Sequence, residues 1–253
     1  MRPPTRLVAD PDRPSLFRSR EDERPAFWTV ALGSPPEVYG ERVTFREDQA
    51  FRRWDPMRSK LGAALAKGYA GPLPASGEYW LYLGAASGTT ASHVADLVGR
   101  SGAVFALEKS LRPFARLLRL ADRYPNLLPV LGDARAPQTY LALVPPVDGL
   151  YVDVAQPDQL PIALENARWF LRRNGVVLLA LKTASMGREL SGRAHLERTL
   201  ETLADVGEVE ESLSLEPLHR RHFFVEVRPS RKWLAPGEPD AKRPVARPAG
   251  RRR

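Results

Sequence analysis

The chain has 253 residues, of which 43% are hydrophobic, enough for one α/β domain with a small additional module. It contains no cysteine, which excludes disulfides and thiolate metal sites, and its four histidines show no metal-ligand spacing. The absence of cysteine suits a reducing compartment, so a cytoplasmic location is expected. No apolar run reaches the roughly 20 residues that span a bilayer, so no membrane association is expected.

The net charge of +8 is concentrated near the C-terminus. Residues 228–253 hold nine Lys/Arg and two Asp/Glu, so the preceding residues carry a net charge of only +1. Five prolines and the final Arg251-Arg252-Arg253 predict a basic disordered tail over residues 229–253. Such a tail binds RNA or another polyanion nonspecifically, or serves only to keep the protein in solution; the sequence favours neither.

The N-terminal quarter predicts a small β-rich module. Residues 1–25, rich in Arg, Pro and acids with little periodicity, predict a flexible arm. Residues 26–56 predict a strand at 26–32 and a hairpin of 38–45 and 51–54, whose turn is formed by residues 47–49. A helix follows over residues 59–69.

Residues 57–228 predict a Rossmann-like domain. Apolar runs at 79–83, 103–107, 127–131, 147–152 and 176–181 are typical of strands buried on both faces. Helical segments lie near 90–98, 111–123, 158–172 and 189–205, and the second has an apolar stripe of Leu111, Phe114, Ala115, Leu118 and Ala121. This alternation predicts a parallel sheet, and the runs at 209–215 and 222–227 add a hairpin at its edge.

The segment from Leu81 to Thr90 predicts a strand, a tight glycine turn and a helix start. Gly84 ends the strand, Ala85 and Gly88 keep the turn small, and Thr89 or Thr90 is placed to cap the helix. Neither a phosphate-loop lysine nor Gly-x-Gly-x-x-Gly is present. The turn therefore favours the nucleoside-binding turn of a class I methyltransferase sheet, and an ordinary glycine-rich turn is the alternative.

Three predicted strands are followed by an acid at the edge where such sheets bind ligands. Glu108 lies twenty residues after Gly88, the spacing at which a carboxylate accepts bonds from both ribose hydroxyls. Asp133 and the Ala134 backbone are placed to receive an adenine amino group. Asp153 precedes Val154, Ala155 and Gln156. Each acid alone has a plain alternative as a helix cap or surface charge, but three in register favour a site.

Two lysines and a histidine lie near the same edge. Lys182 ends the strand at 176–181 and is predicted to face the cleft. Lys60 opens the helix before the sheet, and the pattern alone favours a surface position for it. His222, at the start of the last strand, is unremarkable by itself.

The quoted segments, together with Val38 to Val43, Arg58 to Ala64 and Leu215-Glu216-Pro217, resemble the fibrillarin family over residues 38–228. The form is similar to the compact archaeal-type proteins, since no Gly/Arg-rich N-terminal region is present. The resemblance implies an S-adenosylmethionine-dependent 2′-O-methyltransferase that acts on ribosomal and transfer RNA. It also implies a box C/D guide RNA, a Nop5/56/58-type protein that docks the enzyme, and an L7Ae-type protein that binds the guide.

The turn and the resemblance together assign two sets of residues. The catalytic set is Lys60, Asp153, Lys182 and His222. The expected S-adenosylmethionine contacts are Gly84, Ala85, Thr89, Thr90, Glu108, Lys109, Asp133, Ala134, Asp153, Val154, Ala155 and Gln156. Lys60 and His222 enter the catalytic set through the resemblance alone.

Lys109 is a departure, because the family usually has Phe there to pack on the adenine. A Lys stem covers the ring without stacking on it. Two alternatives therefore stay open: a methyltransferase that acts on a protein glutamine side chain, and a ribonucleoprotein scaffold with weak cofactor binding. Arg42, Arg46, Arg52, Arg53 and Arg58 are candidates for a phosphate-contacting face beside Lys60, with an ordinary solvated basic face as the alternative.

Overall fold

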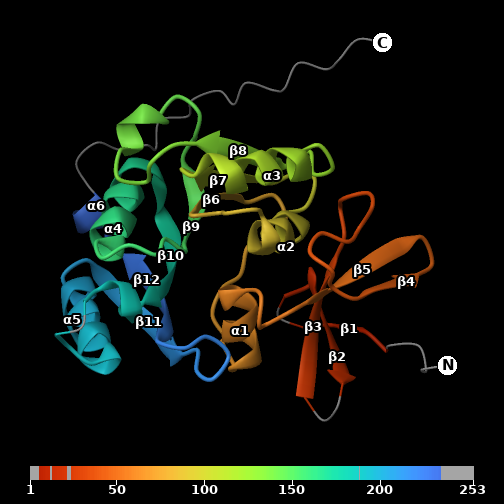
Figure 1. Cartoon of the computed structure of the whole chain (residues 1–253), viewed down its shortest axis with the longest axis horizontal. Helices are drawn as coiled ribbons and strands as arrows, with labels where there is room; N and C mark the ends of the chain where they lie inside the picture. The colour runs from red at the N-terminus through yellow and green to blue at the C-terminus, as the bar shows by residue number, and fades with distance from the viewer. Residues whose placement is uncertain (1–5, 12, 22–23, 188, 235–253) are drawn as a thin grey trace.

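The computed structural model describes residues 6–11, 13–21, 24–187 and 189–234. The chain forms two sheets that lie side by side (Figure 1). The smaller sheet comes from the N-terminal residues and the larger one from the rest of the chain. Most of the predicted basic tail lies outside the described residues.

The N-terminal sheet has five antiparallel strands in the order β1-β2-β3-β5-β4. They are β1 (Val8–Ala9), β2 (Leu16–Glu21), β3 (Arg24–Val30), β4 (Val43–Arg46) and β5 (Gln49–Trp54). The turn between β4 and β5 lies at the predicted position, and Glu47 adopts a positive φ of 51° there.

The structure differs from the prediction that residues 1–25 form a flexible arm, because β1 and β2 lie within this range. Leu7 and Leu16 are buried, and β2 pairs with β3 along its whole length. The many charged residues of this segment hide its strand character, which depends on pairing with β3. The N-terminal module therefore begins well before residue 26.

The larger sheet has seven strands in the order β11-β12-β10-β9-β6-β7-β8. They are β6 (Tyr79–Leu83), β7 (Ala103–Glu108), β8 (Leu127–Leu131), β9 (Val147–Val152), β10 (Leu171–Lys182), β11 (Gly207–Ser214) and β12 (His222–Pro229). The strands from β10 to β8 are parallel, and β12 runs antiparallel to both β10 and β11. This confirms the predicted Rossmann-like α/β sheet with a hairpin at its edge.

Helices cover both faces of the large sheet (Figure 1). Helices α1 (Lys60–Ala66), α2 (Thr89–Val98) and α3 (Leu111–Ala121) pack on one face, where Leu178 and Ala180 of β10 are buried. Helices α4 (Gln159–Phe170) and α5 (Gly192–Ala204) cover the other face, with Leu179 and Leu181. Since side chains alternate along a strand, Lys182 follows Ala180 onto the face that α1 covers.

The apolar stripe predicted for α3 is wrong in its phase. Leu117 and Leu120 are the buried residues of this helix, whereas Leu111 is 71% exposed and Leu118 is 47% exposed. Leucines occur on several sides of α3, so periodicity alone did not decide which of them face β7 and β8.

The predicted tail boundary at residue 229 also differs from the structure. Strand β12 runs to Pro229, and α6 (Arg231–Leu234) follows directly. The guanidinium of Arg168 lies 4.6 Å from the centre of the Trp233 ring, so this turn packs on α4. Within the described part of the chain, the end of the molecule is therefore ordered as far as Leu234.

A buried polar network joins the N-terminal sheet to α2. Arg52 of β5 has no exposed surface and donates to Glu41 at 2.6 Å, to Asp96 at 2.8 Å, to Tyr124 at 2.6 Å and to Ser92 at 3.0 Å. Burial raises the pKa of Asp96 to about 6, and the charge of Arg52 opposes this rise. Arg52 is thus a structural residue, and its proposed place in an exposed phosphate-contacting face is wrong.

Another buried contact of this network involves His93 of α2. Its two ring nitrogens lie 2.8 Å from the hydroxyls of Thr29 and Tyr39, and its ring stacks on Trp54 at 4.7 Å. Burial lowers the pKa of His93, so it is neutral. Helix α2, which starts at the glycine turn, is therefore fixed to strands β3 and β5 of the small sheet through His93.

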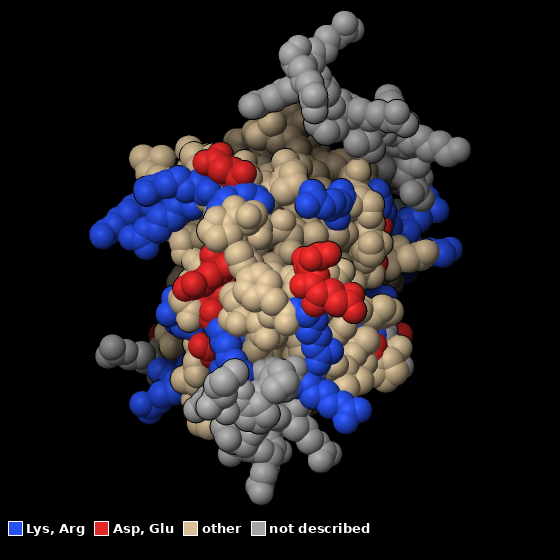
Figure 2. Space-filling view, turned by 90° about the vertical axis from the view of Figure 1, so that its right-hand side faces the viewer, with Lys and Arg blue, Asp and Glu red and all other residues tan. Residues whose placement is uncertain are grey.

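Figure 2 views the molecule from the side of the N-terminal sheet. Lysines and arginines lie in separate groups on this face, with acidic residues and neutral surface between them. The visible face is therefore not one continuous basic field. Among the helices of the described residues, none is long and apolar enough to cross a membrane.

Candidate functional site

The predicted site residues come together at the carboxyl ends of the parallel strands. Gly84 follows β6, Glu108 ends β7, Asp153 follows β9 and Lys182 ends β10. The strand order reverses between β6 and β9, which is where open α/β sheets form a ligand-binding crevice. Helix α1 and the start of β12 bring Lys60 and His222 to the same edge.

The glycine turn is shaped by close backbone packing. Gly84 has a φ of +82°, and a Cβ there would lie 2.7 Å from the Asp153 carbonyl oxygen. Gly88 has a φ of +93°, and a Cβ there would lie 2.3 Å from a methyl of Leu120. Only glycine fits both positions. The turn therefore brings the backbone of Ala85 and its neighbours close to the ends of β7 and β9.

The expectation that a threonine caps α2 is wrong. Gly88 is the N-cap residue, and no side chain bonds the first turn. Thr89 and Thr90 are the first two helical residues, and the Thr90 hydroxyl donates to Ser59 at 3.0 Å. The first N–H groups of a helix have no partner within it, so this end of α2 suits a small polar ligand.

Glu108 is held in place by the backbone on both sides. Its Oε2 accepts from the Ala86 N–H at 3.0 Å, and its Oε1 accepts from the Ser110 N–H at 2.7 Å. The residue is only 9% exposed. Because each carboxylate oxygen accepts more than one hydrogen bond, Glu108 keeps capacity for two hydroxyl donors of a ligand.

Lys109 and Asp133 lie against each other. The Lys109 Nζ is 3.8 Å from Asp133 Oδ2, and Arg135 lies 3.9 Å from the same oxygen. Asp133 Oδ1 accepts from the Arg135 N–H at 3.0 Å, and the neighbouring Ala134 is buried. The Asp133 side chain is 43% exposed, so it is open to a ligand in spite of these cations.

Lys60 and Asp153 form an ion pair. The Nζ of Lys60 lies 2.8 Å from Oδ1 and 3.0 Å from Oδ2 of Asp153. The side chain of Ser59 caps α1 by accepting from Gly62, which places Lys60 at the first helical position. Burial raises the pKa of Asp153, and the charge of Lys60 opposes this rise most strongly, with smaller contributions from His219 and Lys182.

Lys182 and His222 lie directly opposite each other in the antiparallel pair of β10 and β12, so their side chains share one face of the sheet. The amide of Gln159 fixes the backbone of Lys182, since it accepts from the Lys182 N–H at 2.8 Å and donates to its carbonyl at 3.0 Å. The strand end that carries Lys182 is therefore rigidly held by α4.

The protonation state of His222 follows from its partners. Its Nδ1 lies 2.8 Å from the Arg220 carbonyl, which only accepts, so Nδ1 carries the hydrogen. Its Nε2 is buried and has no partner among the residues that the structure describes. Burial lowers the pKa of His222 to about 4, and the charges of Lys60, His219 and Lys182 add to this effect. At neutral pH His222 therefore presents an unoccupied hydrogen-bond acceptor.

His219 belongs to the same cluster and was not singled out from the sequence. Its Nε2 lies 2.8 Å from the Pro56 carbonyl, and its ring centre is 5.9 Å from that of His222. Burial lowers the pKa of His219, while the carbonyl of Pro56 favours the charged form. In the sequence, only its position three residues before His222 indicated that His219 lies near the site.

The residues after Asp153 complete the edge of the crevice. Val154 is buried against Gly84, and Ala155 is exposed. The Gln156 Oε1 is buried without a hydrogen-bond partner in the described structure. Together with His222 Nε2 it is a buried polar atom that suits a ligand donor. No group of three or more metal-ligating side chains occurs within the described residues.

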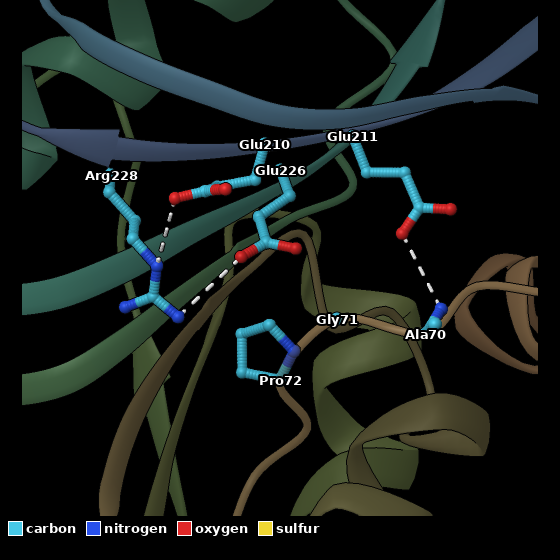
Figure 3. Close-up of a pocket in the computed structure, with 7 residues that line it drawn as sticks. All are labelled: Ala70, Gly71, Pro72, Glu210, Glu211, Glu226 and Arg228. Atoms are coloured by element: carbon cyan, nitrogen blue, oxygen red, sulfur yellow. Dashed lines mark hydrogen bonds and ion pairs between the residues drawn. The ribbon is translucent and has the colours of Figure 1, made fainter.

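A separate pocket of about 340 Å³ lies between β11, β12 and the segment after α1 (Figure 3). It is lined by Glu210, Glu211, Glu226, Arg228 and residues 70–72. Arg228 lies 3.7 Å from Glu210 and 3.6 Å from Glu226, so two of the three acids face a cation. None of the predicted site residues lines this pocket.

Comparison with known proteins points to one family. The fibrillarin family profile matches residues 11–231. A "Fibrillarin-like rRNA/tRNA 2'-O-methyltransferase" of Aeropyrum pernix is 42% identical over 189 residues, which cover 74% of this chain and 81% of that protein.

Two solved structures extend the match to the fold. The structure of Aeropyrum pernix fibrillarin with natively bound S-adenosyl-L-methionine has a TM-score of 0.78 and 37% identity, and covers 88% of this chain and 99% of that one. Fibrillarin in a fibrillarin/Nop5p complex has a TM-score of 0.74 and 35% identity, and covers 84% of this chain and 97% of that one. With a family profile that spans most of its length and relatives of this similarity, the chain belongs to the fibrillarin family.

Proposed function

We propose that this protein is an S-adenosylmethionine-dependent RNA 2′-O-methyltransferase acting on ribosomal or transfer RNA. The observation that carries the proposal is the cluster of Lys60, Asp153, Lys182 and His222 beside the glycine turn. Similarity to the rRNA/tRNA 2'-O-methyltransferase of Aeropyrum pernix supports the reaction, and similarity to fibrillarin with bound S-adenosylmethionine supports the cofactor.

The residues of the crevice suit S-adenosylmethionine. Glu108 offers both carboxylate oxygens to the ribose hydroxyls, and Asp133 with Ala134 offers an acceptor and a backbone to the adenine. The turn from Gly84 through Thr90 allows close approach of the methionine part, and Asp153 to Gln156 close the other side. Lys109 covers the adenine with its stem. When bound, S-adenosylmethionine supplies a methyl group activated on a sulfonium.

The catalytic cluster positions a ribose 2′-hydroxyl and removes its proton. His222 Nε2, neutral and unpartnered, accepts the hydrogen bond of the hydroxyl and so orients it. A group with a pKa of about 4 is a poor final proton acceptor, so we propose that the proton passes through His222 to the side chain of Lys182 on the facing strand. Asp153 forms an ion pair with Lys60 and holds it in place.

The proposal includes the partners of the reaction. A Nop5-type protein is the proposed docking partner, supported by the fibrillarin/Nop5p complex. A box C/D guide RNA that selects the target nucleotide, and an L7Ae-type protein that binds this guide, extend the proposal. A cytoplasmic location is also part of it, supported only by the absence of cysteine.

The test is transfer of a labelled methyl group to a matched pair of RNAs. One RNA carries a ribose at the target position, and the other carries 2′-deoxyribose at that position only. We expect label in the first RNA and none in the second. Equal labelling of both RNAs, or labelling of a protein alone, would contradict the proposal and favour a different acceptor.

A further inference from the structure

The loop of residues 215–221, between β11 and β12, lies beside α1 at the catalytic cluster (Figure 1). Leu215 is fully buried, and its N–H donates to the His222 carbonyl at 3.0 Å. The His219 N–H donates to the Leu215 carbonyl at 2.9 Å. The loop is therefore folded on itself immediately before His222.

Contacts with three other segments hold this loop in place. Lys67 at the end of α1 donates to the Glu216 carbonyl at 2.9 Å. His219 bonds the Pro56 carbonyl ahead of α1 at 2.8 Å. Thr183, next to Lys182, donates to the Arg221 carbonyl at 3.0 Å through both its N–H and its hydroxyl. The loop thus has a defined position relative to Lys60 and Lys182.

The loop presents two exposed arginines next to His222. The backbone carbonyl of Arg220 accepts a hydrogen bond from His222. Within the described structure, neither the Arg220 nor the Arg221 side chain makes a hydrogen bond or ion pair. Arg221 adopts a φ of 56°, which is strained for any residue other than glycine. Its N–H donates to Glu216 at 3.1 Å, and its carbonyl is held by Thr183, so the fold maintains this conformation. Strained residues of this kind cluster at functional sites.

A third arginine lies in the segment that leads into α1. Arg58 is exposed and lies two residues before Lys60, with its guanidinium 5.7 Å from the centre of the Tyr39 ring. Arg58 thus precedes Lys60 by two residues, and Arg220 and Arg221 directly precede His222. Since the phosphates that flank a ribose lie within one nucleotide of its 2′-hydroxyl, exposed arginines next to these residues are candidates to contact them.

We propose that Arg58, Arg220 and Arg221 bind the backbone phosphates of the RNA strand on either side of the methylated ribose. This inference rests on the proposed function, since it takes RNA as the substrate. Guanidinium groups are well suited to phosphate, and contacts of this type position a strand without reading its sequence. The arginine contacts would therefore hold the target ribose at His222 whichever nucleotide is selected.

The test measures the affinity of the full chain for RNA by fluorescence anisotropy as a function of KCl concentration. Arg220→Gln and the double variant Arg220→Gln/Arg221→Gln are compared with wild type, with two RNA oligonucleotides of different sequence. Arg193→Gln on α5 is the matched control, since it removes the same charge on the other face of the sheet. Circular dichroism and S-adenosylmethionine titration check the fold and the cofactor site.

We expect the double variant to weaken binding of both RNAs by at least about fivefold and to reduce the slope of log affinity against log salt by about one per arginine. Arg220→Lys should retain most of the salt slope because it keeps the charge. The basic residues beyond Leu234 are the same in every variant, so their contribution cancels.

A double variant that binds RNA like Arg193→Gln, with the same salt slope, would overturn the inference. Weakened binding of a Nop5-type protein with unchanged RNA binding would also overturn it and assign the loop to a protein partner. Because the readout is binding, it is independent of methyl transfer. An enzyme that transfers no methyl group to RNA would refute the proposed function but leave this measurement interpretable.

Discussion

Glu108 connects the glycine turn to the start of α3 through its two carboxylate oxygens. We predict that Glu108→Ala weakens S-adenosylmethionine binding by about 1.5–3 kcal/mol, the range for hydrogen bonds to a charged group. Isothermal titration calorimetry measures this change, and Glu197→Ala on α5 serves as the control. An unchanged affinity in a folded Glu108→Ala protein would remove this residue from the cofactor site.

Protonation of His222 makes the free energy of unfolding depend on pH. Its pKa is about 4 in the folded protein and about 6.5 when unfolded, so the unfolded chain takes up a proton that the folded one excludes. The stabilising effect of a neutral His222 is complete above pH 6.5 and is lost as the pH falls toward 4. At about 1.36 kcal/mol per pKa unit, the loss is on the order of 3 kcal/mol.

We therefore predict that His222→Asn, which keeps a donor near the Nδ1 position, gives a stability that depends less on pH. The free energy of unfolding by urea, measured for both proteins between pH 7 and pH 4, provides the test. The advantage of wild type should shrink steadily over this range. A constant difference across the range would show that His222 does not titrate as the structure implies.

At the scale of elements, the junction between the small sheet and α2 depends on a buried cation. Arg52→Met leaves Glu41 and Asp96 buried without their partner, so we predict a loss of about 3–5 kcal/mol in the free energy of unfolding. Adding Asp96→Asn should recover part of this loss, because it neutralises one of the unpaired acids. Urea unfolding of both variants measures the effect. A loss below about 1 kcal/mol in Arg52→Met would contradict the account.

The elements that the sequence predicted well are those whose pattern is independent of their neighbours. The strands β6, β8 and β9 coincide with their apolar runs. For the central strands β6 and β9 this follows because a strand buried on both faces is apolar throughout. Asp133 and Asp153 were identifiable because they come within two residues of the ends of the runs of β8 and β9. The sheet and much of its ligand-binding edge therefore followed from local composition.

The remaining features depend on contacts between segments. The phase of α3 and the pairing of β1 and β2 are set by neighbouring strands, and the burial of Arg52 is set by Asp96 and Tyr124 further along the chain. The cap of α2 was assigned to a threonine because threonine is a common capping residue, whereas the actual N-cap residue, Gly88, has no side chain to form a cap. His219 was overlooked because its partner, Pro56, lies 163 residues away.

At the scale of the whole molecule, the sequence beyond Leu234 carries a net charge of +4. Residues 235–253 hold six Lys/Arg and two Asp/Glu. We predict that their deletion lowers nonspecific RNA affinity and its dependence on salt, and leaves S-adenosylmethionine affinity within about twofold. Trp233 has to be retained, since it packs on Arg168. RNA anisotropy and calorimetry on the shortened chain test this, and unchanged RNA binding would show that these residues do not contribute.

The central claim is that the lysines, the acid and the histidine at the strand ends carry out methyl transfer. Lys182→Met tests it most directly, because it removes the proposed proton acceptor and preserves most of the side-chain volume. Single-turnover transfer to a guide-paired RNA, or to any RNA that the enzyme accepts, is compared with wild type and with Lys232→Met on α6 over a range of pH. We predict a rate at least about 10²-fold below wild type, not rescued by raising the pH, with cofactor and RNA affinities within about threefold. A Lys182→Met rate within about threefold of wild type, with the same pH profile, would contradict the account.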